Sequence, residues 1–397
     1  MRVLFLSEYF NYPDTVAARR SHSFVRYLLE SGIDVAISAP YVHEHDHISA
    51  WGETRIPLKT KQREVYASLS KKTSSQIHPS LRRWVPAGMI DRSVASWLRA
   101  AHSNRELNEY ASKCDIVLPS YGPAGPLWAG LSLAYRKKKR FIVDIRDAPE
   151  SRNPPAFFSR YVLHVLENIV FQRAELIVTV GDTLATYFSS RHFGKKTMVI
   201  YNGWTEDDMT ICQQKFAYCR YIYYAGTIYQ HQISALKIVF SSLLMIPDLS
   251  FKIRLIGEND REIRKIADEF GLTERVEILP KVGKERVLEE QRNAVALIVL
   301  ENMDPREAWA SGTVTGKLFG ALASGTSVIA VCSERMEISS ILRKFVKSHS
   351  INNTSQFIDC ISHVNSFDKD PELDVLGDFH MKNQIKQLSS YIRNYDI

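Results

Sequence analysis

Cysteine is scarce in this sequence: only five of the 397 residues are cysteine, and no two of them form a Cys-x-x-Cys pair. A disulfide scaffold and a zinc ribbon are therefore not expected, and a reducing cytoplasm is the compartment that suits such scattered thiols. No apolar run approaches the roughly 18 residues of a membrane-spanning helix, since the longest uninterrupted one covers residues 295–300. The first seven residues hold one arginine in a short apolar stretch, which predicts a β-strand and not a secretory signal.

The common nucleotide-binding and metal-binding motifs are missing too. No Gly-x-Gly-x-x-Gly occurs, so the usual dinucleotide fingerprint is absent. Residues 312–318 resemble a phosphate-binding P-loop, but their glycine spacing is one residue short and Leu318 stands where a magnesium-binding hydroxyl belongs. Three histidines alternate in residues 43–47 without a cysteine or a distal ligand. We expect an exposed loop there and predict no metal site.

The composition is that of a folded protein, with 45% hydrophobic and 24% charged residues, and the length suits two domains of about 200 residues. The positive charge is concentrated. Residues 1–202 carry a net charge of +10, and residues 55–105 hold 11 Lys and Arg against two acidic residues. Such a segment favours a phosphate-rich partner, such as anionic lipid, a phosphorylated acceptor or nucleic acid, but a solvated helix face explains it equally well. No recognised nucleic-acid-binding motif accompanies it, so nucleic acid is not the expected partner.

Short β-branched runs alternate with helical patterns along the whole chain. The strands predicted in the first half are apolar throughout, as buried parallel strands are; they cover residues 3–7, 35–39, 116–120, 141–145, 176–181 and 198–201. Helices are predicted between them at about residues 18–31, 89–112, 123–138, 156–173 and 182–192. The second half repeats the pattern, with strands at 220–224, 252–257, 276–279, 294–300 and 327–331 and helices at about 233–246, 260–270, 283–293, 315–324 and 353–366.

This alternation predicts an α/β protein with two Rossmann-like, doubly wound domains that face each other across a cleft. We place the domains at residues 1–202 and 220–376, with a polar linker at 203–219 and a final amphipathic helix within 377–397. Ligands of such open sheets bind at the carboxyl ends of the strands. The cleft is therefore where we expect the site.

Two groups of polar residues follow predicted strands of the first half. After the first strand come residues 8–13 and then Ala17, Ala18 and Arg19 at the start of a helix, where small residues and arginines favour an anion. An ordinary loop with solvated arginines is the alternative. After the strand 141–145 lie three charges in Asp144-Ile145-Arg146-Asp147, which are costly beside a buried strand unless they form ion pairs or have a function.

A third group is the most specific. Residues 313–325 run from small hydroxyl residues into a predicted helix, with Lys317 in its first turn. A lysine there opposes the helix dipole, which an anion beside it would explain. Backbone donors, hydroxyls and one ammonium would suit a pyrophosphate.

Together these segments resemble the GT-B glycosyltransferases, and specifically the family 4-like enzymes of bacterial surface polysaccharide assembly. The resemblance covers nearly the whole chain. It rests on RVLFLSEYF with ARR near the start, a Pro–Asp–Trp run over residues 86–97, SYGPAGPLWAGL (120–131), FIVDIRD (141–147), AELIVTVGDTL (174–184), VIYNG (199–203), YYAGTIY (223–229) and TGKLFGALASGTSVIA (315–330).

The resemblance implies a nucleotide-sugar donor held mainly by the second domain, an acceptor held mainly by the first, and no metal or other cofactor. Lys317 would contact the donor diphosphate, while Arg146 and Asp147 would lie at the reaction centre; these three are the catalytic candidates. The donor-binding positions it implies are Gly226, Thr227, Thr315, Gly316 and Lys317. Its positions on the acceptor and phosphate side are Ala17, Ala18, Arg19 and Tyr121. It also implies that the transferred sugar retains its anomeric configuration. On the donor side the residues themselves add Thr313 of the hydroxyl-rich loop and Glu301 at the carboxyl end of a predicted strand, although a loop carboxylate that caps a helix is an equal alternative for Glu301.

The sequence departs from the family pattern at two places. The family's two acids, with seven residues between them, fall on Gly312 and Gly320, and the second of these acids is expected to bind the nucleotide ribose. The Arg and Lys that many relatives carry after the first strand of the second domain are also missing. Either another acid, such as Glu301 or Glu307, compensates, or donor recognition is altered.

Residues 81–100 combine arginines with tryptophan and leucine. This suits docking to an anionic membrane surface, where lipid-linked acceptors reside, although a packed lid helix is an equal alternative. The expected protein is thus a cytoplasmic, metal-independent glycosyltransferase, peripheral to the inner membrane face, that acts on a glycan or lipid-linked glycan acceptor. A non-catalytic GT-B homologue that acts as a glycan-binding or partner subunit is the alternative, and a sugar-nucleotide epimerase of similar fold is a third.

Overall fold

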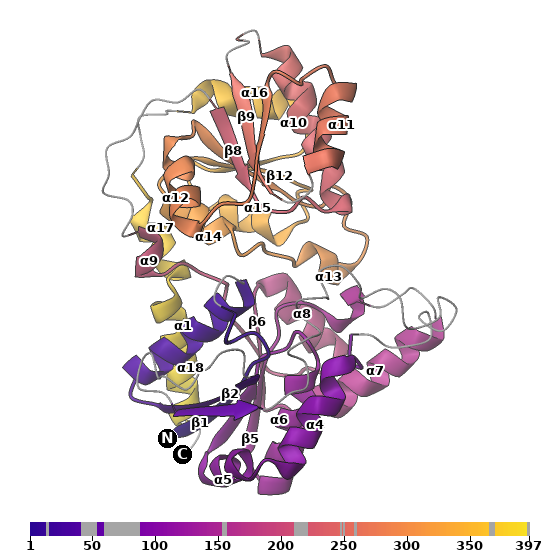
Figure 1. Cartoon of the computed structure of the whole chain (residues 1–397), viewed down its shortest axis with the longest axis vertical. Coiled ribbons are helices and arrows are strands. Elements are labelled where there is room, and N and C mark those ends of the chain that lie inside the picture. The colour runs from indigo at the N-terminus through magenta and orange to yellow at the C-terminus, as the bar shows by residue number, and fades with distance from the viewer. Residues whose placement is uncertain are drawn as a thin grey trace. The chain divides into compact units, whose positions relative to one another are not determined.

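The computed structural model describes residues 1–12, 16–40, 54–58, 88–152, 157–209, 221–246, 248, 251–257, 260–364 and 370–394. Contacts divide the chain into two units. Unit 1 comprises Met1–Tyr201 with Met381–Ile397, and unit 2 comprises Asn202–His380. Each unit is a parallel α/β sheet with helices packed around it (Figure 1). The predicted α/β fold class is therefore confirmed.

The sheet of unit 1 has seven strands among the described residues, in the order β3-β2-β1-β4-β5-β6-β7. All of its pairings are parallel. Its strands are β1 (Arg2–Leu6), β2 (Asp34–Pro40), β3 (Thr54–Leu58), β4 (Ile116–Pro119), β5 (Arg140–Asp144), β6 (Leu176–Thr179) and β7 (Thr197–Val199). The order reverses between β1 and β4, which is the switch point where open sheets bind ligands. The six predicted strands are present, and β3 at the edge was not predicted.

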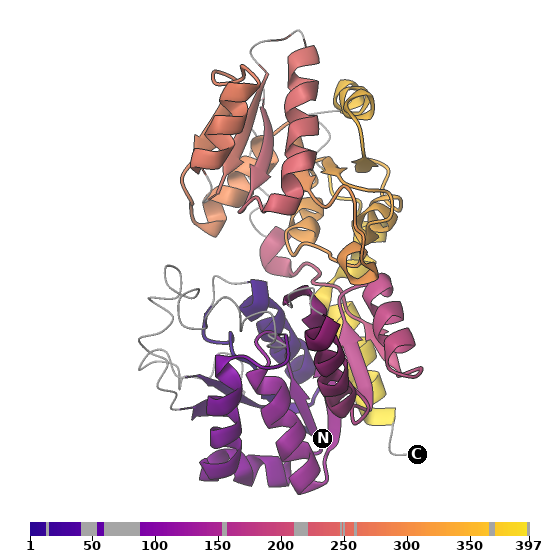
Figure 2. The same cartoon turned by 90° about the vertical axis from the view of Figure 1, so that its right-hand side faces the viewer.

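Helices of unit 1 are α1 (Val16–Glu30), α4 (Arg92–Ser103), α5 (Arg105–Lys113), α6 (Gly125–Lys137), α7 (Phe157–Phe171), α8 (Asp182–Arg191) and α18 (Met381–Asn394), with a 3-10 turn at Pro149–Arg152. The predicted helix 89–112 is broken in two, because Asn104 leaves the helical conformation and its side chain accepts a hydrogen bond from Leu107 N at 3.0 Å. The last helix returns to unit 1, where α18 packs beside α1 (Figure 1); its yellow ribbon lies among the helices of unit 1 in Figure 2 as well. It buries Ile385, Leu388 and Ile392, as their spacing predicted.

The sheet of unit 2 has six strands within the part of the chain that is described, in the order β10-β9-β8-β11-β12-β13, again all parallel. Its strands are β8 (Tyr221–Ala225), β9 (Lys252–Ile256), β10 (Val276–Leu279), β11 (Ala296–Leu300), β12 (Val328–Val331) and β13 (His349–Ile351). The switch point lies between β8 and β11. Strand β11 is buried at every position, as its unbroken apolar run predicted.

Helices of unit 2 are α9 (Glu206–Met209), α10 (Ile233–Met245), α11 (Asp260–Glu269), α12 (Lys284–Asn293), α13 (Ala308–Ser311), α14 (Leu318–Ala323), α15 (Glu337–Leu342), α16 (Thr354–His363) and α17 (Leu373–Leu376), with 3-10 turns at Gln230–Gln232 and Gly377–Phe379. Trp204 at the start of this unit donates from Nε1 to Leu376 O at 2.7 Å, which ties the two ends of the unit together. Residues 210–219 of the predicted linker lie outside the described residues.

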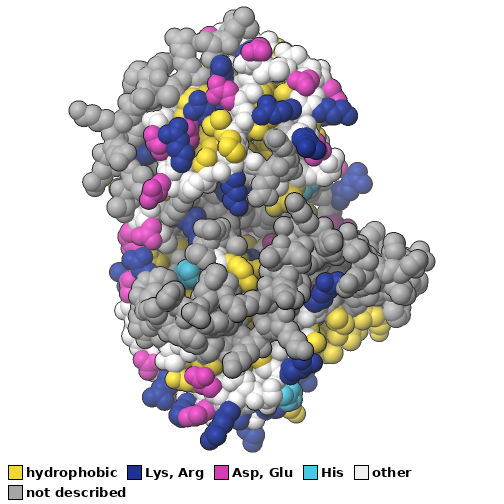
Figure 3. All heavy atoms as spheres, in the orientation of Figure 1, with side chains coloured by type: hydrophobic (Ala, Val, Ile, Leu, Met, Phe, Trp, Pro, Cys, Tyr) yellow, Lys and Arg dark blue, Asp and Glu magenta, His cyan; other side chains and the backbone are white. Residues whose placement is uncertain are grey.

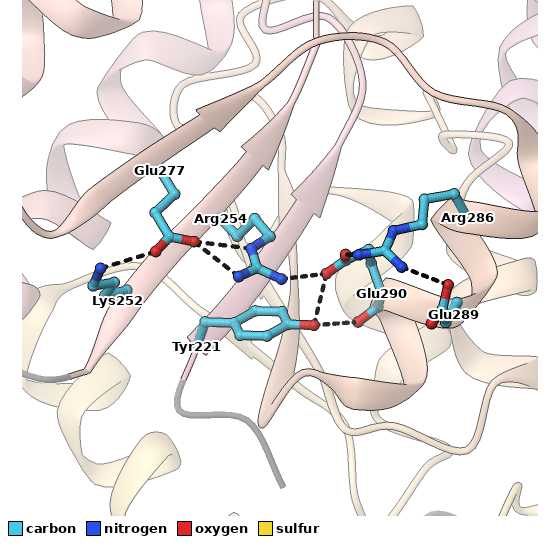
Figure 4. A network of polar contacts seen from close by, with 7 residues as sticks. All are labelled: Tyr221, Lys252, Arg254, Glu277, Arg286, Glu289 and Glu290. Atoms are coloured by element: carbon cyan, nitrogen blue, oxygen red, sulfur yellow. Dashed lines mark hydrogen bonds and ion pairs between the residues drawn. The ribbon is translucent and has the colours of Figure 1, made fainter. Parts of the chain in front are cut away.

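An ion-pair network stabilises the amino edge of the unit 2 sheet, opposite the edge where ligands are expected (Figure 4). Arg254 on β9 lies between two carboxylates, at 2.6 Å from Glu290 of α12 and 2.9 Å from Glu277 of β10. Burial alone would raise the pKa of Glu290, but hydrogen bonds from Tyr221 and Arg254 outweigh it and lower that pKa. The charged side chains at this edge are therefore paired with one another.

Candidate functional site

The most concentrated chemistry of unit 2 lies at its switch point. Strand β8 ends at Ala225 and is followed by Gly226, while β11 ends at Leu300 and is followed by Glu301. Gly226 has a φ of +137°, and a Cβ added to it would lie 1.5 Å from the Lys317 ammonium. Because φ is positive, a side chain would be strained at this position, and the Lys317 ammonium would have to move to make room for it. The structure therefore brings together Gly226, Glu301 and Lys317, which the sequence placed in the donor site.

Lys317 precedes α14 and reaches back over the sheet edge. Its Nζ lies 5.2 Å from the centre of the Tyr224 ring, within the range of a cation–π contact. Its side chain retains an exposed side. Desolvation by the surrounding protein nevertheless lowers the pKa of Lys317, and the nearby Glu301 carboxyl opposes that shift. An exposed cation whose charge is partly desolvated by the protein is well suited to an anionic ligand.

Glu301 is the acid of this site. Its residue is only 3% exposed, and none of the described residues donates a hydrogen bond to its carboxyl. Burial raises the pKa of Glu301 to about 7, although Lys317 pulls it down. Glu307, the other acid considered, precedes α13 and is exposed.

The loop before α14 adds backbone donors. Within the described residues, the N–H groups of Thr315, Gly316 and Lys317 have no backbone acceptor, while Leu318 N closes a turn onto Thr315 O at 3.2 Å. A small cavity of about 30 Å³ lies beneath, lined in part by Tyr224, Gln232, Thr315 and Lys317. That volume holds about one water molecule, so a larger ligand would lie above it at the open side of Lys317.

The remaining donor-side positions surround this point. Thr227 follows Gly226, and its carbonyl accepts a hydrogen bond from the Tyr224 hydroxyl at 3.0 Å. Thr313 is exposed in the loop before α14. Tyr224 and Gln232 were not predicted as site residues. A tyrosine inside a buried strand and a glutamine beyond its end give no sequence signal that separates them from packing residues.

In unit 1, the charges after β5 divide into two groups. Asp144 forms an ion pair with Arg20 of α1 at 2.7 Å, and both side chains are 1% exposed. Ser120 Oγ also donates to Asp144 at 2.8 Å, and Arg20 donates to Ile200 O at 2.7 Å. The ion-pair alternative that the sequence left open thus applies to Asp144. This network ties α1, β4, β5 and the end of β7 together.

Arg146 and Asp147 stay near the carboxyl edge of β5. Arg146 is half-buried and donates to the carbonyl oxygen of Tyr121 at 3.3 Å, whereas Asp147 is exposed. The Tyr121 ring is buried, and its hydroxyl donates to Gly88 O at 2.6 Å. Tyr121 can therefore offer a site its backbone but not its side chain.

The α1 candidates lie in the first turns of that helix. Ala17 is half-buried, Ala18 is fully buried, and Arg19 is exposed. Residues 13–15, which precede the helix, lie outside the described residues. Ala18 therefore packs the helix onto the sheet, and Arg19 is the one of the three whose side chain reaches solvent.

The contact between Glu8 and Trp97, beside this edge, was not predicted. Glu8, two residues after the end of β1, is 1% exposed and accepts a hydrogen bond from Trp97 Nε1 of α4. Trp97 was counted in the 81–100 membrane patch, but it is fully buried, so it belongs to the alternative of a packed helix. Residues 81–87 lie outside the described residues.

An exposed apolar stripe lies instead on α7, at Tyr161, Val165 and Ile169 (lower right in Figure 3).

No helix in the described ranges is long and apolar enough to cross a bilayer. Nor do three His, Cys, Asp or Glu side chains gather there in a way that could hold a metal ion. The histidines of residues 43–47 lie outside the part that the structure describes.

The sequence matches no protein-family profile and no curated protein. Solved structures match over the full length. The sucrose-phosphate synthase of Thermosynechococcus elongatus has a TM-score of 0.65 at 12% identity and aligns over 99% of this chain and 98% of its own. The lipopolysaccharide outer core galactosyltransferase WaaB, in its apo form, has a TM-score of 0.60 at 12% identity, with 99% of each chain covered.

An epimerase is among the similar structures as well. The UDP-GlcNAc 2-epimerase of Methanocaldococcus jannaschii has a TM-score of 0.56 at 12% identity and covers 98% of this chain and 100% of its own. The chain therefore has the GT-B fold that the sequence predicted. At this identity the likeness establishes the fold alone, and the function has to be argued from the site.

Proposed function

We propose that the chain is a glycosyltransferase that moves a sugar from a nucleotide-diphosphate donor to a glycan or lipid-linked glycan acceptor. The observation that carries the proposal is the position of the Lys317 ammonium, which lies against Gly226 and beside buried Glu301 at the switch point of unit 2. Phosphorylated ligands of α/β sheets bind at this point. Glycosyltransferases are among the structures of the same fold.

On the donor side, Lys317 and the N–H groups of Thr315 and Gly316 bind the diphosphate. In the reaction the bond between the sugar C1 and the diphosphate oxygen breaks, and a bond from C1 to the acceptor oxygen forms as the acceptor hydroxyl loses its proton. The departing diphosphate gains negative charge, which a preorganised ammonium and backbone donors stabilise without a metal ion. Gly226, Thr227 and Thr313 line the donor, and Glu301 supplies the acid that Gly320 lacks.

On the acceptor side, Arg146 and Asp147 orient the sugar and the acceptor, with Ala17, Ala18, Arg19 and the Tyr121 backbone beside them. Retention of configuration and action at an inner membrane surface are parts of this proposal that rest on the family resemblance. The basic segment 81–100 would meet the anionic membrane, but Trp97 cannot contribute because it is buried.

An epimerase is the second candidate, since the Methanocaldococcus enzyme shares the fold. A non-catalytic subunit is the third. It is favoured by Gly320, where an added Cβ would meet no atom of the described residues within 4 Å, so the place of the family's acid is not filled by another side chain there.

A thermal-shift panel of UDP, GDP, TDP, CMP and their sugar conjugates, with and without magnesium, tests the proposal first. Ligand at a hundred times its dissociation constant adds about 2.7 kcal/mol of stability. The expected result is a metal-independent shift with one nucleotide, followed by nucleoside diphosphate release that depends on an acceptor. Conversion of the sugar without an acceptor would indicate the epimerase, and no shift with any compound would favour the non-catalytic subunit.

A further inference from the structure

Glu301 is an acid in an environment that disfavours its charge. Its carboxyl is buried, and no described residue donates a hydrogen bond to it. Removing an ionised carboxylate from water without such donors is expensive, so a nearby cation or a bound proton has to compensate. In this structure the compensating cation is Lys317.

The other titratable neighbours of Glu301 are neutral. Tyr224 on β8 and Cys332 after β12 both interact with its carboxyl. Burial raises the pKa of Tyr224 far above neutrality and that of Cys332 to about 12. The Tyr224 hydroxyl donates to Thr227 O. Among the described residues, Lys317 is therefore the one charge that favours the ionised form of Glu301.

A diphosphate at Lys317 would remove this compensation, because its oxygens take the ammonium as their own partner and add negative charge beside the carboxylate. Both effects favour the neutral acid. We propose that Glu301 takes up one proton when the donor diphosphate binds to Lys317. This inference rests on the proposed function, since it requires that Lys317 binds a diphosphate.

The charge on Glu301 then affects how tightly the donor binds. An ionised Glu301 repels an anion that has engaged Lys317, whereas a neutral Glu301 does not. Donor affinity should then fall as pH rises above neutrality, approaching tenfold per pH unit for one linked proton. Glutamine has the shape of the neutral acid and an N–H donor, so Glu301→Gln should bind the donor without this dependence.

Isothermal titration calorimetry measures the proton directly. A nucleotide sugar is the suitable probe, because its diphosphate is esterified at both ends and does not itself titrate near neutrality. The compound that gives the largest thermal shift among UDP-glucose, UDP-GlcNAc, GDP-mannose and TDP-glucose is titrated at pH 7.5 into the full chain, in buffers of different ionisation enthalpy. The slope of binding enthalpy against buffer enthalpy gives the number of protons taken up.

Three variants assign that proton. Glu301→Gln should bind with no uptake, whereas Lys317→Arg, whose guanidinium does not titrate, should retain it. Glu167→Gln in unit 1 removes another buried acid whose pKa burial raises to about 7, and it should behave as the wild type. If Glu301→Gln folds poorly, infrared difference spectra of the wild type supply a second measurement, in which a protonated carboxyl band appears on binding.

Each outcome is decisive. Uptake that is lost in Glu301→Gln and kept in Lys317→Arg supports the inference. Binding without uptake overturns it and leaves the proposed function intact. Uptake that persists in Glu301→Gln and disappears in Lys317→Arg assigns the proton to the lysine and also overturns it. Failure of every nucleotide sugar to bind would reject the proposed function, and the inference with it.

Discussion

Arg20 and Asp144 form a buried ion pair in unit 1, with Arg20 Nη2 2.7 Å from Asp144 Oδ1 and both side chains 1% exposed. Removal of one member leaves the other charge buried without its partner, which costs about 3–5 kcal/mol. Asp144→Ala should therefore destabilise unit 1 by that amount in urea unfolding followed by circular dichroism. Glu109→Ala breaks the exposed Lys113–Glu109 pair of α5 and should cost much less, because solvent screens an exposed pair. Equal effects of the two changes would contradict the structural role of Asp144.

Lys317→Ala should lower turnover by at least about a hundredfold, because a preorganised charge contact to the leaving diphosphate is lost. It should also abolish the thermal shift with the nucleotide sugar. Steady-state kinetics and the thermal-shift panel measure both. Lys265→Ala is the matched control, since Lys265 is 79% exposed on α11; it should change neither quantity. Near-normal turnover of Lys317→Ala would remove Lys317 from the mechanism.

Gly226→Ala should weaken donor binding while the lysine itself remains. An alanine Cβ would lie 1.5 Å from Lys317 Nζ, in a backbone conformation with a φ of +137° that alanine rarely adopts. The ammonium or the loop has to move. Gly283→Ala is the control, because its Cβ would meet no described atom within 4 Å. Donor titrations of both variants measure this effect. Unchanged affinity in Gly226→Ala would mean that Lys317 does not contact the donor from its position against Gly226.

The sequence predicted the strands well because their runs are short, apolar and buried on both faces, as in β4 and β11. It missed β3 and β13, which are edge strands with weak patterns. It predicted one helix over 89–112, because the hydrophobic spacing continues through the break at Asn104.

The candidate site was predicted only in part. Lys317 was recognised from its local motif, but its contact with Gly226 and its coupling to Glu301 depend on tertiary packing that no local pattern records. Trp97 was misread for a related reason. An amphipathic stretch shows which residues are apolar, and it does not show whether their partner is a membrane or, as here, buried Glu8.

Gly320→Glu tests whether the family's ribose-binding acid can be restored. Gly320 lies inside α14, and an added Cβ would meet no described atom within 4 Å. Gly320→Ala should stabilise unit 2 by about 0.5–1 kcal/mol, because glycine is a poor helix residue. Gly320→Glu should be comparably stable and bind the nucleotide sugar more tightly than Gly320→Ala, measured by calorimetry. Equal donor affinity in the two variants would indicate that the ribose does not lie near this position.

Glu167 should make the stability of unit 1 depend on pH. Its carboxyl is buried beside Arg191 at 2.8 Å and faces His192 at 4.0 Å. Burial raises the pKa of Glu167 to about 7, against the pull of Arg191, while burial lowers that of His192 to about 3. The histidine is therefore neutral throughout the range in which Glu167 titrates.

The direction of this pH dependence follows from the pH at which the unfolded and the folded chain each lose the proton of Glu167. The unfolded chain releases it near pH 4.5 and the folded chain near pH 7, so stability falls as pH rises through this window and stays lower above it. Glu167→Gln removes that decline. Relative to the wild type, the variant should gain a few kcal/mol between pH 4.5 and pH 7.5, on the scale of 1.4 kcal/mol per pKa unit, in urea unfolding at each pH. Glu109→Gln is a control with the opposite pH dependence. A hydrogen bond from Lys113 lowers the pKa of Glu109, so the stability of this variant relative to the wild type should fall, not rise, as pH increases. A stability difference between Glu167→Gln and the wild type that does not vary with pH would show that Glu167 is ionised in the folded chain at all of these pH values.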